Sequence, residues 1–167
     1  NLASLDFSNN PNLTYLNCHS NSLTNLDVSN NTLLTNLDCG HNQLTNIDVN
    51  SSTSLTHLYF HDNLIDSIDI SYNINITEML CYQNQITHLD LSGLTMLSLL
   101  DCHNNNLVNL DLRNGNNTAL TYFYANNNPN LYCIAVDDPI FSTANWPNID
   151  SWCNFGTSCI ICDLSMS

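Results

Sequence analysis

The segment LTNLDCGHNQLTNIDV, residues 34–49, decides the fold because it contains the same pattern twice. Apolar residues stand at positions 34, 37 and 39 of its first half, and at positions 44, 47 and 49 of its second half. The last three residues of each half alternate between apolar and polar, which is the two-residue period of a β-strand. Each half therefore predicts one short strand.

This double pattern recurs every 21 residues along most of the chain. The first-half column begins with Leu13, Leu34, Leu55, Ile76 and Leu97, and the second-half column with Leu2, Leu23, Leu44, Ile65, Ile86 and Leu107. A coil of this length with a strand on each side has no room for a long helix. The sequence predicts a mainly β repeat solenoid, flat and nearly straight, with two parallel sheets and coils about 4.8 Å apart. The segment 113–118 holds two extra residues, after which the pattern resumes at Leu120.

Residues 34–49 and their counterparts resemble the nested leucine-rich repeats of bacteria, the IRREKO class, in which ten-residue and eleven-residue halves alternate. The resemblance covers about residues 1–136 and implies a leucine-rich repeat array there. Residues 137–167 would then form a small C-terminal cap, with a short helix and turn near residues 141–150. Because the chain opens inside a repeat, we expect a fragment or a processed product.

Residues 130–159 also resemble the cap that ends repeat arrays in secreted proteins of Bacteroidota. Many of those proteins are exported by the type IX system, whose sorting domain would lie beyond Ser167. The resemblance implies a bacterial protein that is secreted or displayed on the cell surface.

The charge of the chain restricts its partners. Fifteen acidic residues stand against one basic residue, and the formal net charge is −14. Nucleic acids and anionic membranes attract basic surfaces, so we expect neither as a partner. The sequence also lacks the run of about 18 apolar residues that membrane insertion requires.

Four of the eight cysteines share one inward position of the repeat: Cys18, Cys39, Cys81 and Cys102. A ladder of small buried thiols explains this column most simply. Metal binding, or disulfides between stacked coils, are the alternatives, but in-register parallel side chains seldom adopt disulfide torsions.

The other four cysteines, Cys133, Cys153, Cys159 and Cys162, lie outside the repeat and allow three pairings. Resemblance to the secreted caps implies Cys133–Cys159, which leaves Cys153–Cys162. Disulfides indicate an oxidising, extracellular setting. The spacing of Cys159 and Cys162 is formally a CxxC motif, so zinc binding and redox chemistry are alternatives.

Function must use the outward residues, because the inward ones fill the core. The first-half strands vary from coil to coil and mix rings, apolar groups and acids, as a recognition surface requires. We predict a ligand-binding face made of Tyr15, His57, Tyr59, Glu78, Leu80, Tyr82, Asp101, Tyr122 and Tyr124. The alternative is that these rings merely cover a sheet that nothing binds.

The second-half strands present a monotonous face with one aspartate per coil: Asp6, Asp27, Asp48, Asp69, Asp90 and Asp111. Carboxylates about 5 Å apart repel by roughly 0.9 kcal/mol per neighbouring pair even in bulk water. Either Ca²⁺ binds the column from Asp27 to Asp111, or asparagine side chains and backbone amides donate hydrogen bonds to it. If the column raises the aspartate pKa values, the protein should unfold more easily at pH 8 than at pH 5.

No catalytic or cofactor site is expected from spacing. The histidines are scattered, and His19, His61 and His103 should lie about two coils, roughly 10 Å, apart. The leading hypothesis is a protein-binding or glycan-binding adhesion module. A structural spacer or self-associating filament component is the first alternative. Ice or mineral binding by the flat Asn/Asp face is the second, although the threonines that precede the strands do not form outward Thr-x-Thr ladders.

Overall fold

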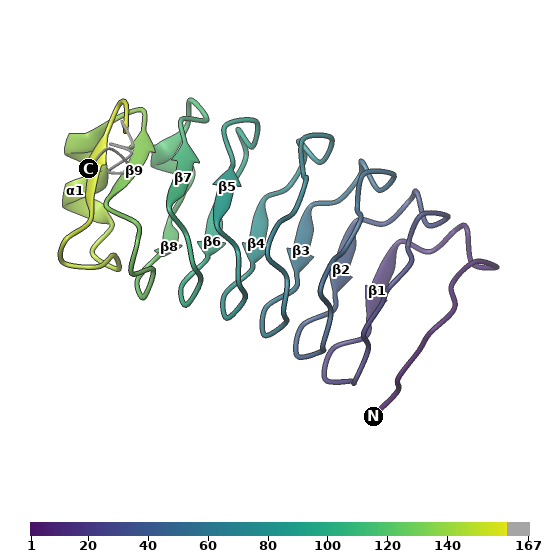
Figure 1. Ribbon diagram of the computed structural model, residues 1–167. Helices are drawn as coiled ribbons and strands as arrows, with labels where there is room; N and C mark the ends of the chain where they lie inside the picture. The colour runs from purple at the N-terminus through teal and green to yellow at the C-terminus, as the bar shows by residue number, and fades with distance from the viewer. Residues whose placement is uncertain (160–167) are drawn as a thin grey trace, which may run out of the picture.

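The computed structural model describes residues 1–159 and shows a solenoid of stacked coils (Figure 1). Six parallel strands form the larger sheet: β1 (Tyr15–Asn17), β2 (Asn36–Asp38), β3 (His57–Tyr59), β4 (Glu78–Leu80), β6 (Leu99–Asp101) and β8 (Tyr122–Tyr124). Tyr15 pairs with Asn36 and Asn36 with His57, a register of 21 residues that matches the repeat. The predicted solenoid and its coil length are therefore confirmed.

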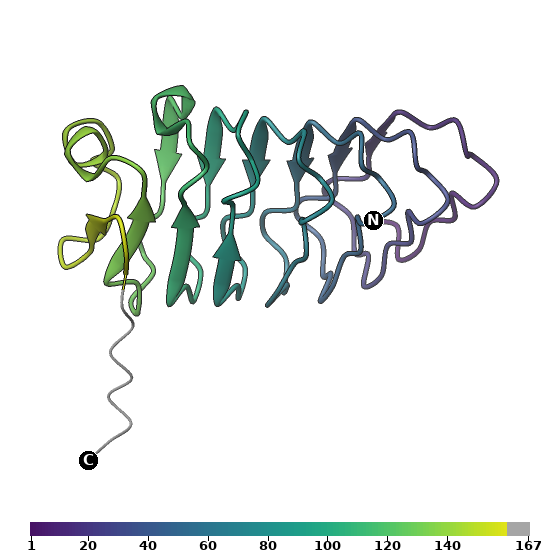
Figure 2. The same cartoon turned by 90° about the horizontal axis from the view of Figure 1, so that it is seen from above.

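The second sheet is shorter than the sequence predicts. It contains β5 (His88–Asp90), β7 (Asn109–Leu112), β9 (Cys133–Val136) and β10 (Asn154–Gly156), in the order β10-β9-β7-β5. The equivalent segments near residues 25–27, 46–48 and 67–69 form no strand. In these coils, hydrogen bonds to the next coil occur at the start of the second half, as from Gln43 to Leu23, but no strand ladder follows them. The coils tilt progressively toward the N-terminus, so the array is not straight (Figures 1 and 2).

The core consists of the inward columns of both halves of the repeat. From Leu16 onward the leucine, isoleucine and valine columns are buried except for the partly buried Ile68, and Cys18, Cys39, Cys81 and Cys102 are buried with them. These four cysteines form no disulfide, as the small-thiol interpretation predicts. Burial raises the pKa of each thiol, that of Cys18 to about 11, which leaves them protonated and unreactive at neutral pH.

Asparagines at the end of each first half connect neighbouring coils. The ladder contains Asn21, Asn42, Asn63, Asn84, Asn105 and Asn128. Asn105 is typical: Oδ1 accepts a hydrogen bond from the backbone N–H of Ile86 at 3.0 Å. Its Nδ2 donates to the carbonyls of Cys81 and Cys102 at 3.0 and 3.1 Å. One side chain thus satisfies three backbone groups where the chain turns.

Threonines make a parallel set of links on the first side. The hydroxyls of Thr35, Thr56 and Thr77 donate to the carbonyls of Thr14, Thr35 and Thr56, at 3.0, 3.0 and 3.1 Å. These hydroxyls are engaged by the coil itself. They therefore link each of these coils to the preceding one.

The C-terminal segment contains the expected short helix, α1 (Pro139–Asn145), after a 3₁₀ turn (Asn117–Ala119) at the two-residue insertion. The side chain of Asp138 accepts hydrogen bonds from Ile140 and Phe141, which caps α1. The Trp146 ring lies 4.8 Å from that of Phe123, and its Nε1 donates to the carbonyl of Leu120. No helix in residues 1–159 has the length and apolar run needed to cross a membrane.

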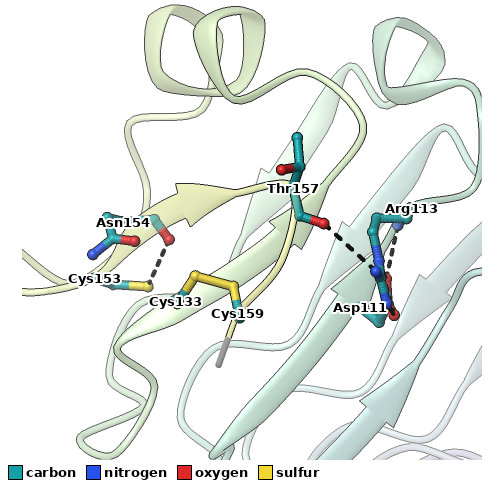
Figure 3. Close-up of a disulfide and its surroundings, with 7 residues drawn as sticks. All are labelled: Asp111, Arg113, Cys133, Cys153, Asn154, Thr157 and Cys159. Atoms are coloured by element: carbon teal, nitrogen blue, oxygen red, sulfur yellow. Dashed lines mark hydrogen bonds and ion pairs between the residues drawn. A yellow bond between two sulfur atoms is a disulfide. The ribbon is translucent and has the colours of Figure 1, made fainter. Parts of the chain in front are cut away.

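A disulfide joins Cys133 in β9 to Cys159, with 5.6 Å between their Cα atoms (Figure 3). This pairing confirms the one implied by the resemblance. The expected partner of Cys153, Cys162, lies outside the described residues. Near the disulfide, Arg113 binds Asp111 through two nitrogens, and its Nη1 donates to the carbonyl of Thr157 at 3.5 Å. The C-terminal segment is therefore attached to the preceding coils by both covalent and polar links.

Candidate functional site

The outward side of the six-stranded sheet brings the predicted binding residues into rows. Strand register aligns Tyr15, Asn36, His57, Glu78, Leu99 and Tyr122 in one row, and Asn17, Asp38, Tyr59, Leu80, Asp101 and Tyr124 in the next. Five strand spacings of about 4.8 Å make the rows roughly 24 Å long. We call this surface the varied face.

Exposed rings stand at the two ends of the varied face. Tyr15 in β1 is 60% exposed, and Tyr122 in β8 is 42% exposed. The rings of Tyr122 and Tyr124 lie 4.7 Å apart, so they form one aromatic surface. Tyrosine combines a large apolar ring with a polar end, which suits it to an interface with a partner.

The middle of the varied face is more ordered and more polar. Glu78 accepts a hydrogen bond from the hydroxyl of Tyr59. Nε2 of His57 lies 3.7 Å from Oε1 of the same glutamate. Burial and the hydrogen bond to Glu78 raise the pKa of Tyr59, which keeps its hydroxyl a donor. These contacts fix three side chains before any ligand arrives, which reduces the entropy lost on binding.

Asp101 does not lie on the open surface that the sequence suggests. It is 6% exposed, because its neighbours in register are Leu80 and Tyr124. Its Oδ1 lies 2.5 Å from Nδ1 of His103. Asp101 therefore positions His103 and leaves little of its own surface for a ligand.

A second row follows the strands, one residue beyond the cysteine column. The rings of His61, Tyr82 and His103 stack at centroid distances of 4.6 and 4.8 Å. Burial, followed by the charges of Asp62 and Asp101, raises the pKa of Tyr82. The predicted site residue Tyr82 is thus part of a ring stack along one border of the varied face.

The expectation that the histidines are too far apart to share a metal ion is wrong at one end of this row. Ring centroids of His19 and His61 lie 5.6 Å apart, and His41 lies 4.7 and 5.0 Å from them. Among residues 1–159, these three are the one group of metal-ligating side chains with ligand atoms close enough to share an ion. Gly40 has the equivalent position in the coil between those of His19 and His61, and the His61 ring lies where a side chain at position 40 would be.

In the aspartate column, hydrogen bonds from backbone N–H groups stabilise the charged carboxylates. Each aspartate accepts a hydrogen bond from the backbone N–H two residues later, at 2.9 or 3.0 Å. Hydrogen bonds lower the pKa values of Asp6, Asp27 and Asp69 through Ser8, Ser29 and Ser71. Arg113 lowers that of Asp111. The column forms no group that could share Ca²⁺ within the described part of the chain.

The expected pH dependence of stability is therefore reversed. A carboxylate whose folded pKa lies below its unfolded value stabilises the fold above the unfolded pKa, and loses that effect as pH falls toward the folded pKa. We expect thermal melts to show a lower Tm at pH 3 than at pH 5, and no loss between pH 5 and pH 8. In the variant Asp27→Asn, Asp69→Asn the side-chain acceptors remain but no longer titrate, so the acid loss should shrink. A higher Tm at pH 5 than at pH 8 would contradict this account.

Two hollows lie on the aspartate side. One of about 290 Å³ lies between Ile68, Ile74 and Leu94, and one of about 350 Å³ lies near Asn46, Asp48 and Asp69. Both are open and have mixed polar and apolar walls. The varied face offers an extended surface of rings and acids instead, which suits a macromolecule better than a small ligand.

Comparison with solved structures finds bacterial leucine-rich repeat proteins. The functional domain of InlJ from Listeria monocytogenes, described as including a cysteine ladder, is 33% identical with a TM-score of 0.73; the match covers 81% of this chain and 33% of that one. The leucine-rich repeat protein LIC12759 of Leptospira interrogans is 20% identical with a TM-score of 0.59, covering 87% and 43%. The internalin inlF from Listeria monocytogenes is 19% identical with a TM-score of 0.51, covering 82% and 46%.

These similarities support a leucine-rich repeat solenoid, and the last two show the fold alone. The cysteine ladder in the description of the InlJ domain has a counterpart in the buried cysteine column here. The chain spans a third to less than half of the length of these three structures. No protein-family model and no curated protein matches the chain.

Proposed function

We propose that this chain is the binding part of an extracellular bacterial adhesion protein, with the varied face as its contact surface for a protein ligand. One observation carries the proposal: a rigid parallel sheet displays exposed tyrosines at both ends and ordered acidic groups between them. A surface of rings and polar groups that differ from coil to coil is typical of a recognition site. The regular aspartate side lacks that variety.

The charge of the chain indicates the character of the partner. With a net charge of −14, the chain favours association with a basic surface and repels an acidic one. The association rate should therefore fall as salt is added, because screening weakens the attraction over about 8 Å at physiological ionic strength. Glycans that stack on the tyrosine rings are the alternative class of ligand.

The location and domain division belong to the same proposal. The Cys133–Cys159 disulfide supports an oxidising, extracellular environment. We propose residues 1–136 as an array of the nested IRREKO class and residues 137–167 as a cap of the kind found in secreted Bacteroidota proteins. The packing of Trp146 against Phe123 supports that role, because the end of a repeat array must be covered.

Removal of the exposed tyrosines tests the binding face. The chain is first probed on an array of purified extracellular-matrix proteins and glycans, and affinities for the strongest hit are then measured. The double variant Tyr122→Ala, Tyr124→Ala should weaken that binding roughly 10-fold or more, as loss of a main aromatic contact does. The fold should survive, because Tyr122 is exposed and Tyr124 only partly buried.

A control of the same residue type removes two tyrosines that lie elsewhere and are more exposed than Tyr122, namely Tyr72 and Tyr132, each 62% exposed. Equal weakening in the control variant, or no binding on the array, would count against the varied face.

Sedimentation at increasing concentration separates the proposal from the filament alternative. Concentration-dependent growth in the absence of ligand would favour self-association instead.

A further inference from the structure

Three consecutive coils each contribute one histidine to a single cluster beside the varied face. His19 follows Cys18, His61 follows Phe60, and His41 lies two residues beyond Cys39. One ring nitrogen from each lies within 4.8 Å of the other two. Imidazole nitrogen is a ligand of Zn²⁺, Cu²⁺ and Ni²⁺, whereas Ca²⁺ and Mg²⁺ prefer oxygen.

Gly40 creates the space that the cluster occupies. A Cβ atom at this position would lie 2.2 Å from Cε1 of His61 and 2.5 Å from its Nδ1, so the imidazole ring occupies the place of a side chain. Any larger residue at position 40 would displace the His61 ring. In the next coils the same row contains Tyr82 and His103, which stack face to face and leave no such gap.

Backbone geometry places the third histidine. His41 has a φ of 50°, and the equivalent residues Ser20, Asp62, Gln83, Asn104 and Asn127 also have positive φ. Few residues with a side chain adopt this left-handed conformation, and asparagine, aspartate and histidine are the ones enriched in it. Among these six equivalent positions, histidine occurs only in the coil that contains Gly40.

The most buried member of the cluster has an unsatisfied nitrogen. His61 is 7% exposed, and its Nδ1 has no hydrogen-bond partner among residues 1–159. Such atoms are rare in folded proteins because burial removes their contact with water. A ligand that accepts a nitrogen lone pair would satisfy His61.

A carboxylate lies next to the cluster. Oδ2 of Asp62 is 3.2 Å from Nδ1 of His41 and 3.4 Å from Nδ1 of His61. Gln83 donates a hydrogen bond to the other oxygen of Asp62, which holds the carboxylate in place. The ion pair between Asp62 and Nδ1 of His41 orients Nε2 of His41 toward a metal ion, as in many zinc sites, whereas Nδ1 of His61 makes no hydrogen bond and is itself available to the ion.

We propose that His19, His41 and His61 bind one Zn²⁺ ion, with Asp62 as a positioning residue and a fourth position open to water. Zn–N bonds of about 2.0 Å in a tetrahedral site require ligand atoms about 3.3 Å apart, so the rings must close in by about 1.5 Å or less. Rotation of His19, which is partly buried, and of His41, which is exposed, provides that movement and an entry path. The ion would link three successive coils.

Zinc titration of the 167-residue chain tests the site. Calorimetry with ZnCl₂ at pH 7.5 should show one ion bound per chain. The variant His41→Asn should bind at least 10-fold more weakly, and its fold should be intact because Asn104 occupies the equivalent turn. The control His88→Asn removes an exposed histidine from the second sheet and should leave zinc binding unchanged.

Cobalt substitution separates this site from the buried cysteines. Co²⁺ bound by three imidazoles and water should give visible absorption without the thiolate charge-transfer band that Cys18 or Cys39 would add. Zinc at about 100 times its Kd should also raise the Tm of the unmodified chain by roughly 5 °C, and the same zinc concentration should raise that of His41→Asn by at most about half as much. The proposal is overturned by absence of zinc binding, by undiminished binding in His41→Asn, or by a thiolate band.

Discussion

Replacing Asn105 with alanine is expected to lower the free energy of unfolding by about 4 kcal/mol. The Asn105 side chain is 4% exposed. Its loss removes the oxygen that accepts from the Ile86 N–H and the nitrogen that donates to the carbonyls of Cys81 and Cys102. Each buried polar group left without a partner costs about 1–3 kcal/mol. Water cannot replace a side chain that lies between two coils without further loss of packing.

Urea denaturation followed by circular dichroism measures this effect, and Asn106→Ala is the matched control. Asn106 is the adjacent residue, and its side chain is exposed. Its replacement should change the free energy of unfolding by less than about 0.5 kcal/mol, as surface substitutions do. If both variants were equally stable, the asparagine ladder would not connect the coils in the way that its hydrogen bonds indicate.

Loss of the Cys133–Cys159 disulfide is expected to cost about 3.5 kcal/mol. The bridge closes a loop with a sequence separation of 26 residues, and the chain-entropy relation for a loop of that length yields this value. The double variant Cys133→Ser, Cys159→Ser removes the bridge without leaving a single thiol. Because the loop contains α1 and β10, these elements should be the first to lose protection from hydrogen exchange.

Hydrogen exchange and thermal melts measure the two parts of this prediction, with Ser158→Ala as a control beside the bridge. Ser158 is exposed and should be replaceable without effect. Unchanged protection of β10 in the serine variant would mean that noncovalent contacts alone attach the C-terminal segment. The ring contacts of Trp146 with Phe123 and Phe155, and the pairing of β10 with β9, are contacts of that kind.

Much of the fold follows from local pattern, because every coil repeats the same constraint. Apolar residues at three fixed positions per half, such as Leu34, Leu37 and Cys39, can all be buried only if the coils stack in register. The sequence therefore predicts the six-stranded sheet, the inward cysteines and the row membership of Tyr15 and Tyr122. The spacing of the cap cysteines did not predict which of them pair, since three pairings were open. The Cys133–Cys159 pairing was predicted from the resemblance to secreted caps.

Departures from the predicted picture arise where neighbouring coils differ. The second sheet lacks strands in the earlier coils, and Asp101 is buried between Leu80 and Tyr124. The sign of the aspartate pKa shifts also depends on which backbone N–H reaches each carboxylate, a contact that periodicity alone does not specify.

The sequence alone determines that this chain is a leucine-rich β-solenoid with coils of 21 residues, because its regularly spaced apolar residues can all be buried only when such coils stack. Only the tertiary structure brought His19, His41 and His61 together. A sequence position assigns a residue to a row, but the space available to its side chain depends on the residue in the next coil. Here that residue is Gly40, and its missing side chain leaves the space that the His61 ring occupies.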